Sequence, residues 1–256
     1  MRRRECLLGL GAGGVASLLS AAPDAHAFGD SGAFHPRLLE GGSPAEVELD
    51  KQALGRWSYE LMARTSAPAR LAVDVVDPAS AALLNEPLLI WTGATEPADL
   101  SKGALRRLRE FLGLGGTLIV DGRGEGAQAF LAGVKRQLGR IVPEAAPVTL
   151  PKSHVLFKSF YLLDGPVGRR PVSGVAEGYA LGKMTQIILL ECDLLGALTP
   201  GPGGQGYAYP ITPGGSVQRE QAVRFAVNLG MYVLCSDYKD DQVHAPFLMR
   251  RRARSP

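Results

Sequence analysis

The chain has 256 residues, of which 46% are hydrophobic and 21% are charged, and its formal net charge is +3. This length is enough for one sizeable hydrophobic core, or for one core with an appendage. The nearly balanced charge excludes the strongly basic footprint of a nucleic-acid-binding protein, so no nucleic-acid partner is expected.

Residues 1–27 have the pattern of an export signal. Arg3 and Arg4 precede an apolar stretch, and small residues lead to a cleavage site between Ala27 and Phe28. The paired arginines are typical of twin-arginine signals. The apolar stretch spans about 16 residues, whereas a transmembrane helix needs roughly 20. We therefore expect a protein that is exported to the periplasm or secreted, with no transmembrane segment in the mature chain.

Strand-length apolar runs alternate with helical periodicity after the signal, which predicts an α/β fold with a mainly parallel sheet. Single strands are expected at residues 34–39, 72–76, 87–92 and 117–121, and a strand pair at 178–184 and 185–191. Helices are expected at residues 49–64, from Ser101 to the glycines at 115–116, at 127–141 and at 217–234.

Two segments lack a clear period. Residues 142–171 are rich in proline and are predicted to cross one end of the sheet irregularly, whereas residues 200–215 have the composition of a flexible loop. The α/β domain is expected to cover residues 28–240. Residues 241–256 end in four closely spaced arginines and are interpreted as a basic tail.

Six short segments, taken in order, resemble a bacterial domain-of-unknown-function family, number 4159. They are residues 34–38, 88–93, 115–121, 153–161, 193–196 and 228–232. The resemblance covers nearly all of the mature chain. It implies a fold like that of class I glutamine amidotransferases, which is a flavodoxin-like, three-layer α/β/α sandwich with its site above the carboxyl ends of the strands.

The chemistry of the amidotransferases is not expected here. Their nucleophilic Cys lies on the sharp turn after a central strand, and the corresponding turn of this chain, residues 121–126, contains no Cys. Cys192 and Cys235 are interpreted as buried apolar residues. The chain also has no G-x-S-x-G motif of a serine hydrolase.

Metal and cofactor chemistry have little support in the sequence. His35, His154 and His244 are isolated, and the chain has neither an H-E-x-x-H nor a C-x-x-C motif, so no metal site or cofactor is expected. The glycine-rich turn from Gly122 to Gly126 formally matches the start of a dinucleotide-binding motif. Binding of a phosphate or nucleotide at this turn stays open as an alternative.

The candidate site residues are the polar and glycine positions at predicted strand ends, where open α/β sheets bind ligands. They are Thr92, Gly93, Asp121, Arg123 and Asp193.

His154 joins these candidates because apolar residues would hold it against the protein. Paired with Asp121 or Asp193, it would be a general base.

These observations favour an exported, non-catalytic binding or assembly module of the cell envelope, whose partner is an envelope protein or a small molecule. A hydrolase that uses His154 with Asp121 or Asp193 is the alternative. The two differ in space, because a hydrolase needs His154 and the carboxylates to line one pocket.

Overall fold

The computed structural model describes residues 32–171, 175–182 and 184–252. The predicted signal over residues 1–27 and its cleavage site between Ala27 and Phe28 lie outside these residues, and so do the last four residues of the predicted tail.

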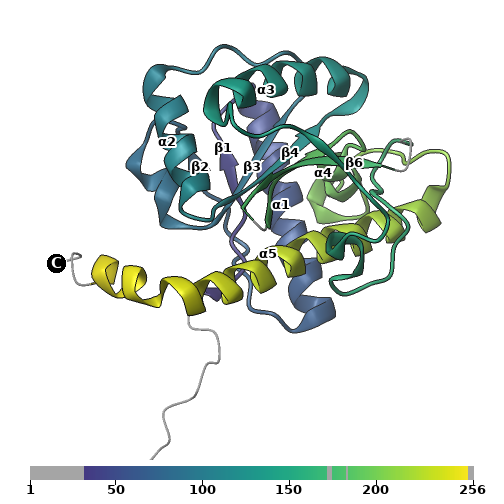
Figure 1. The fold of residues 1–256 in the computed structure, drawn as a ribbon. Coiled ribbons are helices and arrows are strands. Elements are labelled where there is room, and N and C mark those ends of the chain that lie inside the picture. Colours follow the sequence, from purple (N-terminus) through teal and green to yellow (C-terminus); the bar gives the residue numbers. More distant parts are fainter. Residues whose placement is uncertain (1–31, 172–174, 183, 253–256) are drawn as a thin grey trace, which may run out of the picture.

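The described residues form a seven-stranded sheet in the order β2-β1-β3-β4-β7-β6-β5 (Figure 1). The neighbouring pairs from β2 to β7 are parallel, whereas β6 is antiparallel to both β7 and β5. The strands are β1 (Arg37–Leu39), β2 (Val75–Val76), β3 (Leu88–Gly93), β4 (Thr117–Gly122), β5 (Val148–Leu150), β6 (Ala176–Leu181) and β7 (Met184–Leu190).

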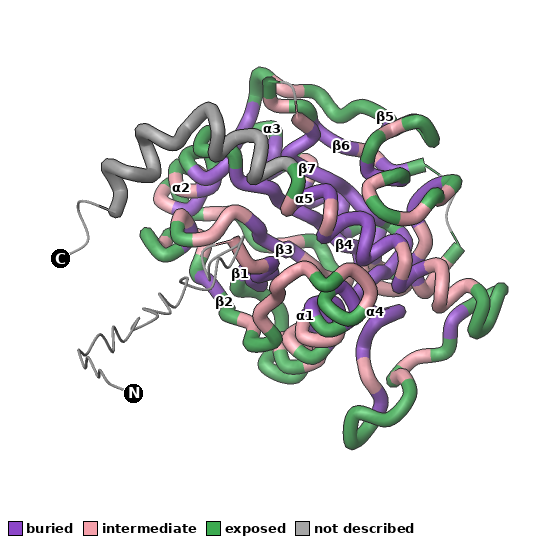
Figure 2. Tube along the Cα trace, turned by 90° about the horizontal axis from the view of Figure 1, so that it is seen from below, coloured by how far each residue is buried: buried purple, intermediate pink, exposed green. Residues whose placement is uncertain are grey.

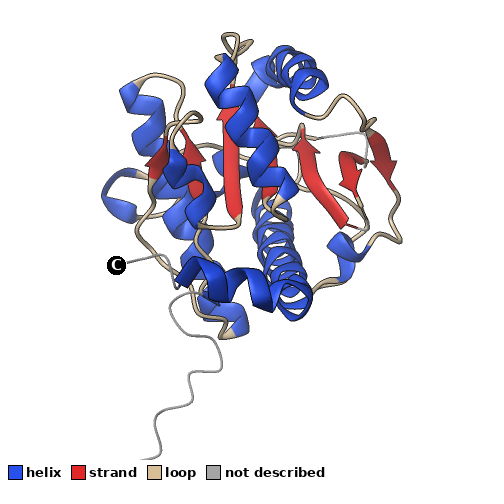
Figure 3. Ribbon diagram, turned by 60° about the vertical axis from the view of Figure 1, so that its left-hand side comes forward, coloured by secondary structure: helices blue, strands red, loops and turns tan. Residues whose placement is uncertain are grey.

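Helices cover both faces of this sheet (Figure 3). One apolar core joins the sheet to α1, α4 and α5, and a second joins its other face to α2 and α3. The helices are α1 (Pro44–Thr65), α2 (Lys102–Gly113), α3 (Ala127–Ile141), α4 (Leu194–Leu198) and α5 (Gly215–Arg252). The prediction of a three-layer α/β/α sandwich with a mainly parallel sheet is thereby confirmed.

The middle strands are the most deeply buried part of the sheet (Figure 2). Ile119 of β4 faces the core under α1 and α5, whereas its neighbours Leu118 and Val120 face the core under α2 and α3. This alternation is the two-residue period of a strand covered on both faces, and it explains why β4 is a continuous apolar run in the sequence.

Helix α1 begins five residues earlier than the sequence predicts. Ser43 and Glu46 form a reciprocal capping box, and Pro44 occupies the first turn, where its missing N–H costs nothing. Further along α1, the indole Nε1 of Trp57 donates to the carbonyl of Ala226 on α5, at 2.7 Å. The early start matters for function because it places two acidic side chains, Glu46 and Asp50, in the first two turns of the helix.

The predicted irregular excursion contains a short edge strand, β5, and a 3-10 turn, η4 (Val155–Lys158). Asn228 of α5 is fully buried and holds the segment after η4: its Oδ1 accepts from the backbone N–H of Phe160 and Tyr161, and its Nδ2 donates to the carbonyl of Tyr161. Residues 153–161 and 228–232, which carry part of the family resemblance, are therefore direct neighbours in space.

Helix α5 continues well past its predicted end at residue 234 and runs to Arg252, into the segment interpreted as a tail. The predicted range contains α5 residues that pack on the core, among them Val223, Val227 and Val233. Strand β2 is shorter than predicted, with two residues instead of five, because it lies at the sheet edge and has one strand neighbour. No described helix is apolar over a long enough stretch to span a membrane.

Candidate functional site

The carboxyl ends of β3, β4 and β7 lie side by side. Thr92 pairs in register with Asp121, Gly93 with Gly122, and Asp121 with Leu190. Asp193 follows β7 after two residues and begins α4. The structure thus brings Thr92, Gly93, Asp121 and Asp193 to one edge of the sheet, as their positions at predicted strand ends indicate.

The turn after β4 packs tightly on the segment after β3. A Cβ added to Gly126 would lie 1.7 Å from the carbonyl oxygen of Ala94, a distance that no side chain can tolerate. The backbone N–H of Arg123 also donates to the carbonyl of Gly93 at 2.8 Å. Gly126 therefore serves the close packing of two backbone segments, whereas Gly124 supplies a left-handed backbone conformation, with φ of 57°.

Asp121 is buried beneath this edge. Its two carboxylate oxygens accept from the backbone N–H groups of Leu194 and Leu195, at 3.0 and 2.8 Å. Burial, reinforced by the negative charge of Asp193, raises the pKa of Asp121 well above its usual range. Asp121 is 2% exposed and does not line the cavity described below, so its place in the structure is to anchor the start of α4.

Asp193 connects three segments of chain. Its backbone is in the left-handed region, with φ of 56°, and its Oδ1 accepts from the N–H of Gly196. Its Oδ2 accepts from the N–H of Gly124 at 3.0 Å and from Nε of Arg169 at 2.6 Å. This carboxylate therefore holds α4, the turn after β4 and the chain near residue 169 in fixed relation.

Arg123 makes a second ionic cluster on the same edge. Its Nη2 lies 2.5 Å from each carboxylate oxygen of Asp50, and its Nη1 lies 3.1 Å from Oε1 of Glu46. Burial is the main cause that raises the pKa of Asp50 to about 6; Arg123 opposes the rise, and the negative charges of Glu46 and Asp193 add to it. The cluster joins α1 to the turn after β4.

These two clusters flank a cavity of about 250 Å³. Five separate segments converge on it: the first turns of α1, the ends of β3 and β4, the chain near residue 169, and the start of α4 with the loop that follows. Its lining residues are Leu49, Asp50, Ala94, Arg123, Gly124, Glu125, Gly126, Arg169, Asp193, Gly196, Thr199 and Tyr209. Arg169 lies over the ring of Tyr209, 5.2 Å from its centre.

The loop that was expected to be flexible, residues 200–215, is tied to the helices on either side. The ring of Tyr207 contacts the guanidinium groups of Arg219, at 4.0 Å, and Arg56, at 5.5 Å. Arg219 also donates to the carbonyls of Ala197 and Tyr209. The loop thereby has a defined position beside the cavity, to which it contributes Tyr209.

His154 is not part of this site. Its Nδ1 accepts from the N–H of Leu156, so Nε2 carries the proton of the neutral ring and donates to Oγ1 of Thr185 at 3.2 Å. Thr185 is near the start of β7, whereas Asp121 pairs with Leu190, five residues further on, which is about 17 Å along the strand. The expected pairing of His154 with Asp121 or Asp193 is therefore wrong, because these groups lie at opposite ends of the sheet.

The surroundings of His154 account for its lowered pKa and for its structural role. Partial burial lowers its pKa below the usual value, and the ring contacts Tyr232, whose hydroxyl hydrogen-bonds to the backbone of Thr185. His154 caps the 3-10 turn η4 and ties the excursion to β7.

Thr92 and Gly93 lie at the expected edge but outside the cavity lining. Oγ1 of Thr92 is buried and has no hydrogen-bond partner among the described residues. Gly93 packs against the ring of Phe130, which a Cβ would approach to 2.6 Å. Of the six candidate positions, Arg123 and Asp193 line the cavity, and Asp121 lies beneath it.

Asp50, Arg169, Thr199 and Tyr209 are cavity residues that the sequence interpretation missed. Asp50 had a usable signal, since Glu46 and Asp50 are four residues apart and so share one face of a helix. For Arg169, which lies in a segment without periodicity, the sequence offers no such signal.

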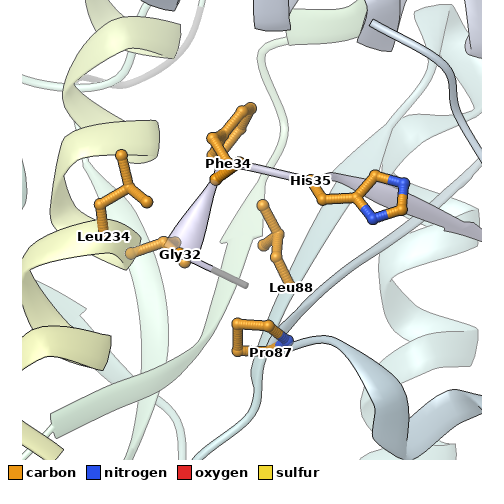
Figure 4. Close-up of a pocket in the computed structure, with 8 residues that line it drawn as sticks. Gly32, Phe34, His35, Pro87, Leu88 and Leu234 are labelled. Carbon is orange, nitrogen blue, oxygen red and sulfur yellow. The ribbon is translucent and has the colours of Figure 1, made fainter. Parts of the chain in front are cut away.

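Two other hollows differ in kind. The first lies between the start of β3 and α5, where Figure 4 shows Phe34, His35, Pro87, Leu88 and Leu234 around it; it holds about 10 Å³, barely room for one water molecule. The second is a shallow surface groove along the start of α5. It is lined by Tyr207, Pro210, Ile211, Gly215, Ser216, Arg219, Glu220 and Val223.

The two cysteines differ from each other. Cys192 is fully buried at the end of β7, and burial raises the pKa of its thiol, so it is no nucleophile. Cys235 is exposed, which corrects its interpretation as a buried residue, and the two are unpaired. Among the residues that the structure describes, no group of three or more His, Cys, Asp or Glu side chains could hold a metal ion.

The family model described as "Domain of unknown function (DUF4159)" matches residues 39–234. This range contains every residue of the cavity. No curated protein is significantly similar to the chain.

Proposed function

The chain belongs to the DUF4159 family, whose function is unknown, and we propose that this member is a non-catalytic binding module of the cell envelope. Its small-molecule ligand occupies the cavity between the Asp50–Arg123 and Arg169–Asp193 pairs. One observation carries the proposal. Five segments that are distant in sequence converge on a cavity of about 250 Å³ at the carboxyl ends of the strands, where α/β folds bind ligands.

A binding role is favoured over catalysis because the charged groups of the cavity already have partners. Arg123 is paired with Asp50 and Glu46, and Arg169 with Asp193. The hydroxyl of Thr199 donates to the carbonyl of Leu195, with no base against it. A nucleophile needs an adjacent base to activate it, and these contacts supply none.

The cavity also favours a small ligand over an envelope protein as the partner. A protein would bind an extended surface, whereas the lining residues here surround one partly open cavity of about 250 Å³. Two predictions from the sequence remain predictions. One is the likeness of the fold to that of the amidotransferases, and the other is the binding of a phosphate or nucleotide at residues 122–126. The phosphate alternative is weakened by the carboxylates, Asp50 and Asp193, that neighbour the turn.

The proposed site is tested by thermal denaturation of the full chain with a panel of metabolites and glycans. We expect at least one compound to raise the melting temperature. Ala94→Leu adds three carbon atoms to the lining, which narrows the cavity without removing an ion pair and should abolish the shift. Ala129→Leu, on the exposed face of α3, is the matched control and should retain it. No shift with any compound, or equal shifts in both variants, would refute the proposed site.

Export is proposed from the sequence pattern of residues 1–27. The paired change Arg3→Lys and Arg4→Lys keeps the positive charge but removes the guanidinium groups, so a twin-arginine precursor should accumulate in the cytoplasm. Amino-terminal sequencing of the exported protein should begin at Phe28. Unchanged export of the double variant would refute the twin-arginine route, and a mature protein that still begins at Met1 would refute the cleavage.

A further inference from the structure

We infer that the cavity takes a neutral, hydroxyl-rich ligand of the size of a monosaccharide. This inference rests on the proposed function, because it names the ligand class of the same cavity. It follows from how the charges of the lining groups are arranged.

The positive charges at the cavity are already neutralised. Nη2 of Arg123 lies 2.5 Å from Asp50, and Nη1 lies 3.1 Å from Glu46. Arg169 lies 2.6 Å from Oδ2 of Asp193. In these two clusters, two guanidinium groups face three carboxylates. Glu125, a further carboxylate of the cavity lining, lies 3.8 Å from Arg170, so no positive charge is left over to attract an anion.

The surrounding charge disfavours anionic ligands further. The negative charges of Glu46 and Asp193 raise the pKa of Asp50 in addition to its burial, even with Arg123 in contact. The pKa of Asp121, beneath the cavity, is likewise raised by burial and by the negative charge of Asp193. A phosphate or carboxylate ligand would add a like charge where protein burial weakens screening.

The two buried carboxylates of the cavity already have partners. Asp193 is 1% exposed, and its oxygens accept from Gly124, Gly196 and Arg169. Both oxygens of Asp50 contact Arg123. The guanidinium groups already neutralise these two carboxylates, so an ammonium group would compete with Arg123 and Arg169 and would gain less than at an unpaired carboxylate. Glu125, the other carboxylate that lines the cavity, is 94% exposed, so water screens its attraction for a cationic ligand.

Hydroxyl groups fit what is left. A guanidinium has five N–H donors, and the ion pairs of Arg123 and Arg169 involve two nitrogens of each. Both side chains keep about a fifth of their surface exposed and line the cavity. A sugar hydroxyl can accept from these donors and donate to the exposed carboxylate of Glu125 or to the Tyr209 oxygen, and it brings no net charge.

The volume agrees with this ligand class. About 250 Å³ corresponds to roughly eight water molecules. The ordered hydroxyls of one sugar ring can replace such a cluster, whereas drug-sized ligands usually occupy about 300 to 1,000 Å³. A nucleotide would therefore be too large as well as too negative.

A charge series on one sugar scaffold tests the inference. Calorimetric titration of the full chain compares the neutral sugars glucose, galactose, mannose and N-acetylglucosamine with cationic glucosamine and anionic glucose 6-phosphate. We expect the best neutral sugar to bind at least about tenfold more tightly than either charged one, and to lose its binding in Ala94→Leu but not in Ala129→Leu.

The outcomes separate the inference from the proposed function. The inference is overturned, and the binding cavity stays in place, if glucose 6-phosphate or glucosamine binds more tightly than every neutral sugar. The same holds if no neutral sugar binds but a charged compound of the wider panel does. Sugar binding that persists in Ala94→Leu would also overturn it. If no compound of any class binds, both the inference and the proposed function fail.

A charge-removing variant supplies an independent readout. Glu46→Gln removes a half-exposed carboxylate from the Arg123 cluster, so the affinity for glucose 6-phosphate should rise while that for the neutral sugar stays within about twofold. Lys51→Gln, on the same helix but away from the cavity lining, is the control and should change neither. An unchanged phosphate affinity in Glu46→Gln would contradict the argument from excess negative charge.

Discussion

Asp50→Asn should remove a large part of the pH dependence of stability. In the folded protein the pKa of Asp50 is raised from 3.8 to about 6, chiefly by burial. A carboxyl with a raised folded pKa keeps its proton when the unfolded chain has already lost it. The folded state therefore binds more protons in this window, and stability falls as the pH rises from about 4 to about 6.

The size of the effect follows from the shift. A rise from 3.8 to about 6 is about two pH units, which corresponds to about 3 kcal/mol over the whole window. Between pH ~4 and pH ~7 about 2 kcal/mol of it is expressed, because the unfolded carboxyl is already partly ionised at the lower limit. The asparagine of the variant cannot ionise, so it makes no such contribution.

The measurement is urea unfolding of the wild type and of Asp50→Asn over this pH range. The free energy of unfolding of the wild type minus that of the variant should fall by about 2 kcal/mol as the pH rises. Glu220→Gln is the control, since Arg64 lowers the pKa of Glu220 to about 2 and its difference should stay flat above pH ~5.5. A difference for Asp50→Asn that stays constant across the range would refute the rise that burial causes in the pKa of Asp50.

Three further predictions test the packing at the site and the exclusion of His154 and Cys192 from it. Gly126→Ala should destabilise the fold by about 1–3 kcal/mol or more, because the new methyl group clashes with the segment after β3. Gly139→Ala is the control, since Gly139 lies in open space on α3. It should stabilise the fold by up to about 1 kcal/mol in the same denaturant assay. His154→Ala should cost about 1 kcal/mol and leave ligand-induced thermal shifts intact; their loss would restore His154 to the site. Cys192→Ser should cost about 1–3 kcal/mol without loss of binding, and loss of binding in a folded variant would implicate the thiol.

Regular elements with a strong period could be predicted from the sequence. Helix α3 has the predicted bounds, and the capping residue Ser101 correctly places the start of α2. Strand β4 extends one residue beyond the prediction. In each case, the burial of one helix stripe or of both strand faces leaves a pattern within a short window of sequence.

Short elements and long-range pairs could not be predicted. Strand β5 has three residues, two of them exposed, so it shows no apolar run, and α4 is too short for a helical period. Arg123 and Asp50 are 73 residues apart, and Arg169 and Asp193 are 24 apart. Such ion pairs depend on the tertiary arrangement of loops, which leaves no local trace. The pairing of His154 with Asp121 or Asp193 was wrong for the same reason. The path of residues 142–171 decides at which end of the sheet His154 lies, and this path leaves no local pattern in the sequence.

The proposed function requires that a ligand occupies the cavity at the carboxyl ends of the strands. Hydrogen exchange of the full chain, with and without the compound that raises its melting temperature most, tests this claim directly. We expect slower exchange of backbone amides at residues 122–126 and 199–209, and no change around His154 at the opposite end of the sheet. Protection around His154 with unchanged exchange at residues 122–126 would contradict it.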